Sequence, residues 1–392
     1  MKQKVIIFYP FRFRNYDYDR FEIKYLEKFF KIYIFDLLEI IHPHFNKAYT
    51  KEKYIPKNVY KFKNFNEIKK FLIINNLHTK NEKIKILNFV SSVNINSLKI
   101  NILIKNLNCK IFGFYNPGNY FWKTNDLSIF NRLSFTFSQI LRDTPRFIWN
   151  LKVRFFNFLN NLFNIKIDLI FVAGKEYLKS MKGKKVVEIN SWDYSRLIRS
   201  KKKIKSYKKK IITFLDSPGP LFKSDSYLLK RKNDESAEKT YPSLNIFFKI
   251  LEKKYKAKVV IAAHPKTKHK KKPKYFYGRK VVHGNSLELI FNSKLVVTRN
   301  SSAITYAIEY HKPLLFIYTD EILEKKNLGF YNIYFLAKEL GLNALNINSK
   351  KKINNILKLN KNKYFSFKKK YFSSLNKLTT NHDIIKKELE KK

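Results

Sequence analysis

Short apolar runs alternate with amphipathic stretches along the first half of the chain. The apolar runs predict buried strands, and the stretches with apolar residues at every third or fourth position predict helices. Strands are predicted over residues 5–9, 32–35, 84–90, 110–114, 168–172 and 185–189. Helices are predicted over residues 17–30, 66–73 and 97–107. This order of elements is typical of a parallel sheet with crossover helices.

The same pattern restarts after a charged, lysine-rich linker over residues 196–210. Strands are predicted over residues 211–215, 258–262, 280–282, 295–298 and 314–318, and helices over 241–255, 286–291 and 303–310. The chain ends in a lysine-rich stretch, residues 371–392, which predicts a helix. We therefore expect an α/β protein with two doubly wound domains, residues 1–198 and 199–360, and a helical tail, residues 361–392.

A helical segment over residues 132–167, interrupted at Pro145, breaks the rhythm of the first half. After Pro145 it mixes basic side chains with Phe and Trp. This mixture describes an amphipathic helix at a membrane interface. The alternative is a helical insertion that packs its aromatic side chains on the first domain.

Composition adds a large positive charge to this picture. The 392 residues contain 81 Lys and Arg against 30 Asp and Glu, a formal charge of +51. Such an excess suits nucleic acid, an anionic membrane or an acidic substrate, but a genome rich in A and T also produces it. The charge is spread along the chain without a nucleic-acid-binding module, so nucleic acid is not an expected partner. The single cysteine, Cys109, fits a reducing compartment, and no apolar run is long enough to span a membrane.

Three loops of the second half follow predicted strands directly, at the sheet edge where open α/β sheets bind ligands. The first is His264-Pro265-Lys266. A histidine at this point can donate to a phosphate oxygen and stabilise the charge on a departing nucleotide, with Lys266 adding positive charge. The alternative is a histidine that only satisfies a loop carbonyl.

The second loop is Arg299-Asn300-Ser301-Ser302, which we expect to begin a helix. Free N–H groups in a first helical turn, together with the serine hydroxyls, bind anions, and Arg299 would help to neutralise them. Simple N-capping by Asn300 or Ser301 is the structural alternative.

The third loop begins at Asp216 and contains Gly219. Gly219 permits close approach of the backbone to a ligand. Asp216 could orient a ligand hydroxyl, act as a base or only form a turn. A further turn, Gly284-Asn285, could border a nucleotide base, although Asn285 with Glu288 also resembles a capping box.

The stretches VVIAAHPK and HGNSLELIFNSKLVVTRNSSAITYAIEYHKPLLFI resemble the donor-binding half of GT-B glycosyltransferases, whose two Rossmann-like domains face a cleft. The resemblance is to the capsule and surface-carbohydrate group that uses CMP-sugars, including sialyl-, Kdo- and polysialyltransferases. These enzymes carry a His-Pro motif and a downstream Ser/Thr-rich motif around the nucleotide. The resemblance implies that His264, with Pro265 shaping its loop, and Ser301 and Ser302 hold the phosphate of the donor.

One departure from the family pattern bears on the nucleotide. UDP-sugar enzymes of this fold typically bind the ribose with a Glu placed seven residues before the Pro of a Gly-x-Pro motif. Counting back from Pro313 reaches Tyr306, and the Gly position holds His311; Glu309 is a weak substitute. This counts against a UDP-sugar enzyme and is compatible with a CMP- or CDP-linked donor.

The catalytic base of the family usually comes from the first domain, in an acidic pair followed by Gly that this chain lacks. Asp17, Asp19 and Glu22 follow the first strand, and we take Asp17 as the first candidate. The loops at residues 116–118 and 191–194 are other candidates. Inversion or retention at the anomeric carbon stays open.

The sequence thus predicts a GT-B glycosyltransferase that needs no metal or cofactor. It would transfer a sugar from a nucleotide-activated donor, with a CMP-sugar favoured, to a surface polysaccharide such as capsule or lipopolysaccharide, or to a lipid-linked glycan. We expect it in the cytoplasm, with attachment to the anionic inner face of the membrane as an option. The alternatives are a CDP-polyol phosphotransferase of the same architecture and a basic protein without activity that binds nucleic acid or membranes.

Overall fold

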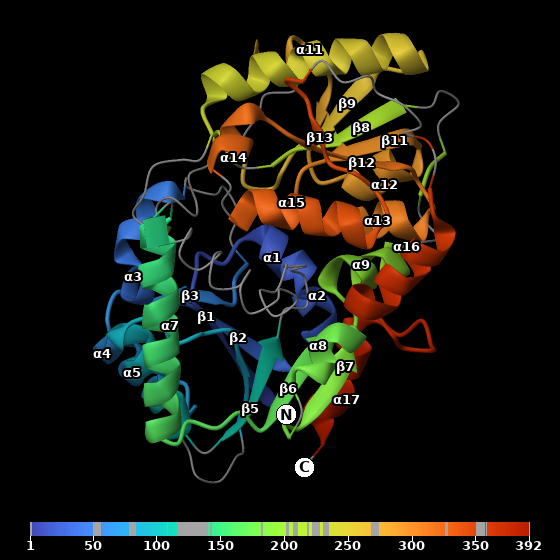
Figure 1. Cartoon of the computed structure of the whole chain (residues 1–392). Helices are drawn as coiled ribbons and strands as arrows, with labels where there is room; N and C mark the ends of the chain where they lie inside the picture. The colour runs from blue at the N-terminus through green and yellow to red at the C-terminus, as the bar shows by residue number, and fades with distance from the viewer. Residues whose placement is uncertain are drawn as a thin grey trace.

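The chain forms two α/β units, one above the other (Figure 1). The computed structural model describes residues 2–49, 56–77, 84–107, 109–115, 140–141, 143–181, 183–200, 204–206, 211–217, 219–221, 228–229, 235–267, 274–325, 328–349, 357 and 359–391. The predicted loop at residues 116–118, part of the 132–167 segment and Pro218 lie outside these residues.

The first unit is built on a seven-stranded parallel sheet with the strand order β3-β2-β1-β4-β5-β6-β7. The strands are β1 (Lys4–Tyr9), β2 (Lys31–Asp36), β3 (Val59–Lys61), β4 (Ile84–Asn88), β5 (Cys109–Tyr115), β6 (Leu169–Ala173) and β7 (Val186–Ile189). Each predicted strand of this half is therefore present. The short edge strand β3 was not predicted, because three residues carry too little apolar pattern.

Helices cover both faces of this sheet, which explains why its strands are apolar on both sides. One face packs against α3 (Leu38–Ile41), α4 (Phe65–Ile74) and α5 (Ile95–Lys105), and shares a core with Ile6 and Phe8. The other face packs against α2 (Ile23–Leu26) and α17 (Asn381–Glu390), and shares a core with Val5 and Ile7. The 3₁₀ helix η1 (Pro43–Ala48) follows α3.

The helix predicted over residues 17–30 is divided in two. It forms α1 (Asn15–Arg20) and α2, and between them Glu22 has a left-handed backbone with φ 61°. The side chain of Glu22 is fully buried. Because a non-glycine residue enters this region only where its surroundings hold it, the interruption depends on tertiary contacts that the apolar pattern does not show.

The second unit is built on a six-stranded sheet with the order β10-β9-β8-β11-β12-β13, again parallel. The strands are β8 (Ile211–Leu215), β9 (Val259–Ala262), β10 (Val281–Val282), β11 (Ser293–Thr298), β12 (Leu314–Tyr318) and β13 (Leu345–Asn346). Helix α11 (Ala237–Tyr255) covers the outer face, with η4 (Lys274–Phe276) beside it. Helices α12 (Ser286–Phe291), α13 (Ile304–Glu309) and α15 (Leu328–Glu339) lie on the side of the first unit, and α14 (Asp320–Lys325) precedes α15 (Figure 1).

The connection between the units is more helical than predicted. Helix α8 (Lys175–Lys179) follows β6, and α9 (Trp192–Ser200) follows β7. The predicted linker at residues 196–210 therefore begins inside α9. Helix α9 buries Trp192, Tyr194 and Leu197 on its hydrophobic face. The charged residues around them concealed this apolar pattern in the sequence.

The C-terminal segment returns to the first unit. It consists of α16 (Lys361–Phe367), the π-helical turn η5 (Lys368–Phe372) and α17, so the continuous helix predicted over residues 371–392 is wrong. The side chain of Asn381 joins α17 to Asn190 by two hydrogen bonds: Asn190 N–H to Asn381 Oδ1 at 2.8 Å, and Asn381 Nδ2 to the Asn190 carbonyl at 2.9 Å. Both chain ends consequently lie at the same end of the molecule (Figure 1).

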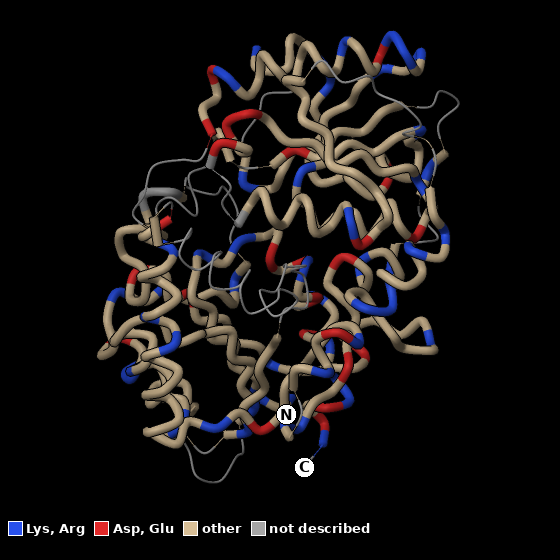
Figure 2. Tube along the Cα trace, in the orientation of Figure 1, with Lys and Arg blue, Asp and Glu red and all other residues tan. Residues whose placement is uncertain are grey.

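The aromatic segment of the first half forms α7 (Thr144–Leu162). Residues 140–141 are helical and Asp143 is not, and Pro145 lies in the first turn of α7, where its missing N–H costs nothing, so the described residues show the predicted interruption just before Pro145. None of the residues of α7 is buried. Within the described part of the chain, no helix has both the length and the apolar character needed to cross a membrane. Figure 2 shows Lys and Arg distributed over both units.

Candidate functional site

A cavity of about 320 Å³ lies between the two units. The second unit lines it with the ends of β8 and β9, the turn before α12 and the turn after β11, which are the regions that the sequence indicated. The first unit and α9 line the opposite wall. The lining residues are Arg14, Tyr16, Arg20, Asp193, Arg196, Leu215, Asp216, Ala262, Ala263, His264, Pro265, Lys266, Gly284, Ser286, Asn300, Ser301, Ser302 and Ala303.

His264 follows β9 and lines the cavity with a defined ring tautomer. The backbone N–H of Lys266 donates to His264 Nδ1 at 3.1 Å. Because Nδ1 accepts, the hydrogen of a neutral ring sits on Nε2, which can donate to a ligand. Burial lowers the pKa of His264 to about 3, and the charges of Lys266, Arg14 and Arg20 add to this effect. At neutral pH the ring is therefore an uncharged donor beside several cations.

The turn after β11 differs from the prediction. Helix α13 begins at Ile304 and has only six residues, so Ser301 and Ser302 lie in the turn before it. Ser301 Oγ accepts the backbone N–H of Ala303 at 3.3 Å. In the part of the chain that the structure describes, no side chain caps α13. The helix predicted from residue 303 thus begins one residue later, the N-cap considered at Asn300 or Ser301 is not formed, and an anion at this turn would meet hydroxyl and N–H groups without a long helix behind them.

The residues of the third loop separate into two places. Asp216 lines the cavity, and its Oδ2 accepts the hydroxyl of Thr267 at 3.2 Å. Gly219 of this loop and Arg299 of the second loop lie outside the lining. Arg299 is buried and forms an ion pair with Glu235, and a Cβ at Gly219 would come within 2.7 Å of Glu235 Oε2. Glu235 therefore neutralises the positive charge of Arg299, which the sequence analysis expected to face the ligand.

Gly284 and Asn285 also separate. Gly284 lines the cavity, has φ 73°, and its carbonyl accepts Arg196 Nη2 at 3.3 Å. Asn285 is not among the lining residues. Its Nδ2 donates to Glu288 Oε2 at 2.9 Å, and its side chain makes no capping bond to the backbone, so the expected capping box is not formed.

The acidic candidates after the first strand hold other residues in place. Asp17 is buried and accepts the backbone N–H of Arg14 at 3.1 Å and Arg14 Nε at 3.3 Å. Asp17 does not line the cavity, but it fixes Arg14, which does. Asp19 pairs with Arg196 at 3.6 Å and Arg199 at 3.7 Å. These roles leave none of the described acids of α1 facing the ligand space.

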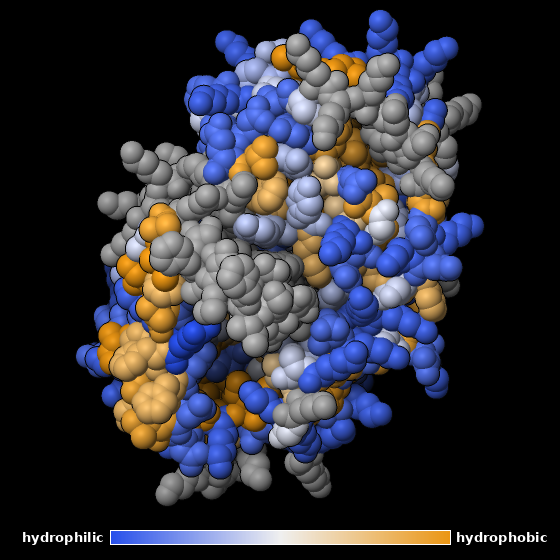
Figure 3. Space-filling view, in the orientation of Figure 1, coloured by the Kyte–Doolittle hydropathy of each residue, from blue (hydrophilic) through white to orange (hydrophobic). Residues whose placement is uncertain are grey.

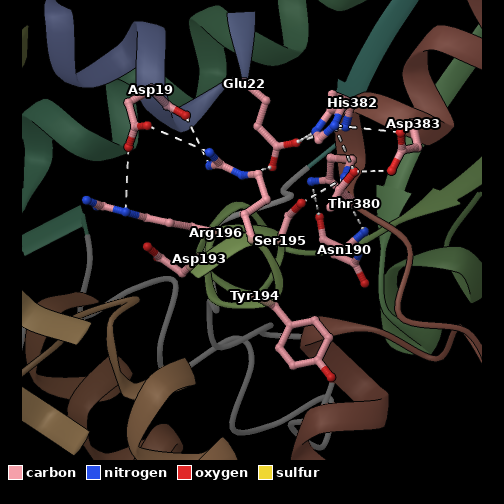
Figure 4. A network of polar contacts seen from close by, with 12 residues as sticks. Asp19, Glu22, Asn190, Asp193, Tyr194, Ser195, Arg196, Thr380, His382 and Asp383 are labelled. Carbon is pink, nitrogen blue, oxygen red and sulfur yellow. Dashed lines mark hydrogen bonds and ion pairs between the residues drawn. The ribbon is translucent and has the colours of Figure 1, made fainter. Parts of the chain in front are cut away.

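Glu22 is the centre of a polar network that joins α2, α9 and α17 (Figure 4). His382 Nδ1 lies 2.6 Å from Glu22 Oε2, and Arg199 Nε lies 3.3 Å from Glu22 Oε1. The ring of His382 stacks on Tyr25 with centroids 4.5 Å apart. The network fixes α9, the helix that carries Asp193 and Arg196 to the cavity.

The structure identifies one further carboxylate in the cavity wall. It belongs to the loop at residues 191–194, which the sequence offered as one of several candidates for the catalytic base. Asp193, in the first turn of α9, lines the cavity and is 7% exposed. Its Oδ1 accepts the hydroxyl of Tyr306 at 3.0 Å, and Oδ2 is buried without a hydrogen-bond partner in the described part of the chain. Burial and the neighbouring Asp193 raise the pKa of Tyr306 well above its ordinary value, so the phenol stays a donor.

Three arginines and a tyrosine on the first-unit side were also missed: Arg14, Tyr16, Arg20 and Arg196. Arg20 Nε is buried without a hydrogen-bond partner among the described residues. Burial lowers the pKa of Arg20, but Tyr16, Asp193 and Asp17 outweigh it, so its pKa is raised and it stays charged. The signal for Arg14, Tyr16 and Arg20 was present in the sequence, because RFRNYDYDR follows the first strand at the carboxyl edge of the sheet.

The positions relevant to ribose binding have other contacts. Tyr306 is 1% exposed, and Glu309 forms an ion pair with Lys368 at 2.9 Å. Among the described residues, no group of three His, Cys, Asp or Glu side chains is arranged to hold a metal ion.

No protein-family model and no curated protein matches the sequence. Among solved structures, a single-residue variant of the wall teichoic acid polymerase TagF is similar, with a TM-score of 0.51 and 14% identity over 99% of this chain and 89% of that chain. The chain has the GT-B fold. Lower TM-scores relate it to the UDP-GlcNAc 2-epimerase of Methanocaldococcus jannaschii with UDP-GlcNAc and UDP, at 0.43 (13% identity, 94% of this chain and 99% of that chain). UGT2 of Phytolacca americana, in complex with UDP-2-fluoro-glucose and pterostilbene, scores 0.47 (12% identity, 93% of this chain and 89% of that chain).

The GT-B fold accounts for the position of the cavity. Two doubly wound domains of this fold place the carboxyl ends of their strands toward each other, and ligands bind there. The expected fold class is therefore confirmed.

Proposed function

We propose that this chain is a glycosyltransferase that uses a nucleotide-activated sugar donor. The observation that carries the proposal is the convergence of His264, the Ser301–Ser302 turn and the arginines of the first domain on one interdomain cavity. A site lined by three arginines, a lysine and a neutral histidine donor suits a phosphate group. The donor's phosphate would lie between the His264 loop and the serine turn.

In the proposed reaction, a hydroxyl oxygen of the acceptor attacks the anomeric carbon of the donor sugar. The bond from that carbon to the phosphate oxygen breaks, and the nucleotide leaves with the electron pair. His264 Nε2–H donates to the phosphate and stabilises the charge that develops on it, and Arg14 and Arg20 face the same space. Such preorganised donors are often the largest single contribution to catalysis.

Asp193 is our candidate for the base that removes the proton of the acceptor hydroxyl. The cavity lining contains two acids among the described residues, Asp193 and Asp216. Each acid has one oxygen in a hydrogen bond, Asp216 Oδ2 with Thr267 and Asp193 Oδ1 with Tyr306, so the two differ in position: Asp216 lies beside the proposed donor site. Among the described residues Asp193 Oδ2 has no hydrogen-bond partner, and Tyr306 orients the carboxylate through Oδ1. It lies on the first-domain side, opposite the proposed donor site.

We propose a CMP-linked sugar as the donor, as the sequence motifs suggest. The support is the lack of a ribose carboxylate at the family position: Tyr306 is buried against Asp193, and Glu309 is paired with Lys368. A surface polysaccharide or a lipid-linked glycan would be the acceptor, and a lipid carrier would bring the enzyme to the inner face of the cytoplasmic membrane.

A second candidate is the transfer of a polyol phosphate from a CDP-linked donor. Two observations favour it: the fold similarity to a teichoic acid polymerase, and three arginines on the side where an acceptor would enter. Guanidinium groups suit phosphate oxygens, and an acceptor that carries phosphodiesters would meet them. Analysis of the product separates the two reactions, since the first forms a glycosidic bond and the second a phosphodiester.

The decisive experiment is a thermal-shift screen of the full chain against CMP, CDP, UDP and GDP. A ligand that binds only the native state raises the melting temperature, and we expect CMP or CDP to do so. The variant S301A/S302A should lose the shift, whereas S243A, in the exposed part of α11, should keep it. If no nucleotide at millimolar concentration shifts the melting temperature, the proposed function is wrong.

A further inference from the structure

Helix α7 displays an apolar stripe on its outer side. The stripe residues follow one another at alternating intervals of three and four, so they share one face of the helix. Their exposed fractions are large: Ile148 46%, Leu151 47%, Phe155 55%, Phe158 62% and Leu162 67%. Figure 3 shows hydrophobic side chains gathered on the surface over α7.

The opposite side of α7 attaches the helix to the first domain. The ring of Trp149 lies 6.3 Å from that of His42, and Ser92 Oγ donates to Asn160 Oδ1 at 2.8 Å. Lys105 Nζ donates to the carbonyl of Phe163, just beyond the helix, at 2.8 Å. The outer stripe is thus not the face that stabilises the helix on the domain, and its exposure needs another explanation.

A contiguous apolar stripe of this size is the kind of patch that marks an interaction surface. The charges around it identify the partner. Helix α7 contains Arg146, Lys152 and Arg154 and no Asp or Glu. Lys152 and Arg154 are exposed beside the stripe. A second copy of the chain is a poor partner, because each copy carries a formal charge of +51 and the two would repel.

We propose that α7 docks the protein on an anionic lipid surface, lying in the plane of the interface with its apolar stripe among the acyl chains. Amphipathic helices with basic and aromatic side chains bind in this way, through buried apolar area and attraction to anionic headgroups. The inference does not depend on the proposed reaction, because docking requires neither donor nor acceptor.

The test is flotation of the full chain with vesicles of phosphatidylcholine alone or mixed with phosphatidylglycerol. The wild type should float with the mixed vesicles and lose most of its binding in high salt. The stripe variant L151N/F155N/F158N should bind at least about tenfold more weakly. The control I74N/I246N/L378N changes three apolar residues elsewhere that are more exposed than the three changed in the stripe variant (78%, 64% and 66%) and should bind as the wild type does.

Two results would overturn the proposal. If the stripe variant binds mixed vesicles as well as the control does, the dispersed positive charge binds lipid and α7 is not the docking face. If the wild type ignores the vesicles but self-associates through the stripe in sedimentation velocity, the occupant is a second copy. Circular dichroism melting of each variant shows that it is folded, and the nucleotide thermal shift should be the same in all three proteins.

Discussion

The neutral tautomer of His264 leads to a prediction that separates a catalytic from a structural role. Its Nδ1 is occupied by the backbone N–H of Lys266 at 3.1 Å, so Nε2 is the ring atom that can donate to a ligand. Replacing His264 by Ala removes one donor to a developing oxyanion. Such a loss typically costs about 10²–10³ in kcat, or about 2.7–4 kcal/mol. We expect H264A to release nucleotide from its donor more slowly by that factor.

Two further substitutions assign the effect to one ring atom. In H264N the side-chain oxygen can still accept the Lys266 N–H, but nothing replaces Nε2, so we expect the same loss as in H264A. In H264Q the amide reaches the place of Nε2, and about tenfold of the rate should return. The assay is release of the nucleotide from the donor that the thermal-shift screen identifies, followed by chromatography.

The pH dependence supplies an independent check. Because burial and nearby cations lower the pKa of His264 to about 3, the free enzyme should not lose kcat/KM through this group between about pH 5 and 8. A near-normal rate in H264N would refute the reasoning, since the histidine would then only hold its loop. A wild-type titration near pH 6.5 that disappears in H264Q would also refute it.

Three other predictions follow from buried polar groups. D193N should lower kcat by about 10²–10⁴ in the transfer assay and leave the nucleotide thermal shift unchanged; a lost shift would show that Asp193 binds the donor instead. E22A should lower the free energy of unfolding in urea by about 3–5 kcal/mol, because the nearly buried Arg199 loses its buried partner. A loss below about 1 kcal/mol, the usual value for an exposed ion pair, would contradict this. Burial, with His44, lowers the pKa of His42 to about 4, so the unfolded chain takes up a proton that the folded chain does not. His42 should therefore cost about 2 kcal/mol of stability between pH 6.5 and pH 5, and H42Q should show a shallower acid decline in melting curves; an identical slope would contradict the assignment.

The fold was largely predictable because both sheets are buried on both faces. Strand β12 is an unbroken apolar run and β8 is interrupted only by Thr213, and the predicted limits of both agree with the structure. The interruption at Glu22 was not predictable from the pattern, since a left-handed backbone at a glutamate depends on Arg199 and His382, far away in the sequence. The edge strand β3 was too short to detect.

The second-domain half of the site was predictable because its loops follow strands. His264, Asp216, Gly284 and the serine turn line one cavity, as their positions at strand ends implied. The first-domain half depended on a choice that sequence could not make: among several acids after strands, only the folded chain shows that Asp17 holds Arg14 whereas Asp193 reaches the cavity.

The return of the C-terminal segment bears on how the protein is made. Ile385 and Leu389 of α17 belong to the same apolar core as Val5 and Ile7 of β1. The first domain is therefore discontinuous in sequence, and a fragment ending at residue 200 lacks part of its own interior. Domains usually fold in order as the ribosome produces them. Here the second domain can complete its sheet before the first domain receives α17, the last helix of the chain. Premature termination near the C-terminus would therefore damage the domain that was synthesised first.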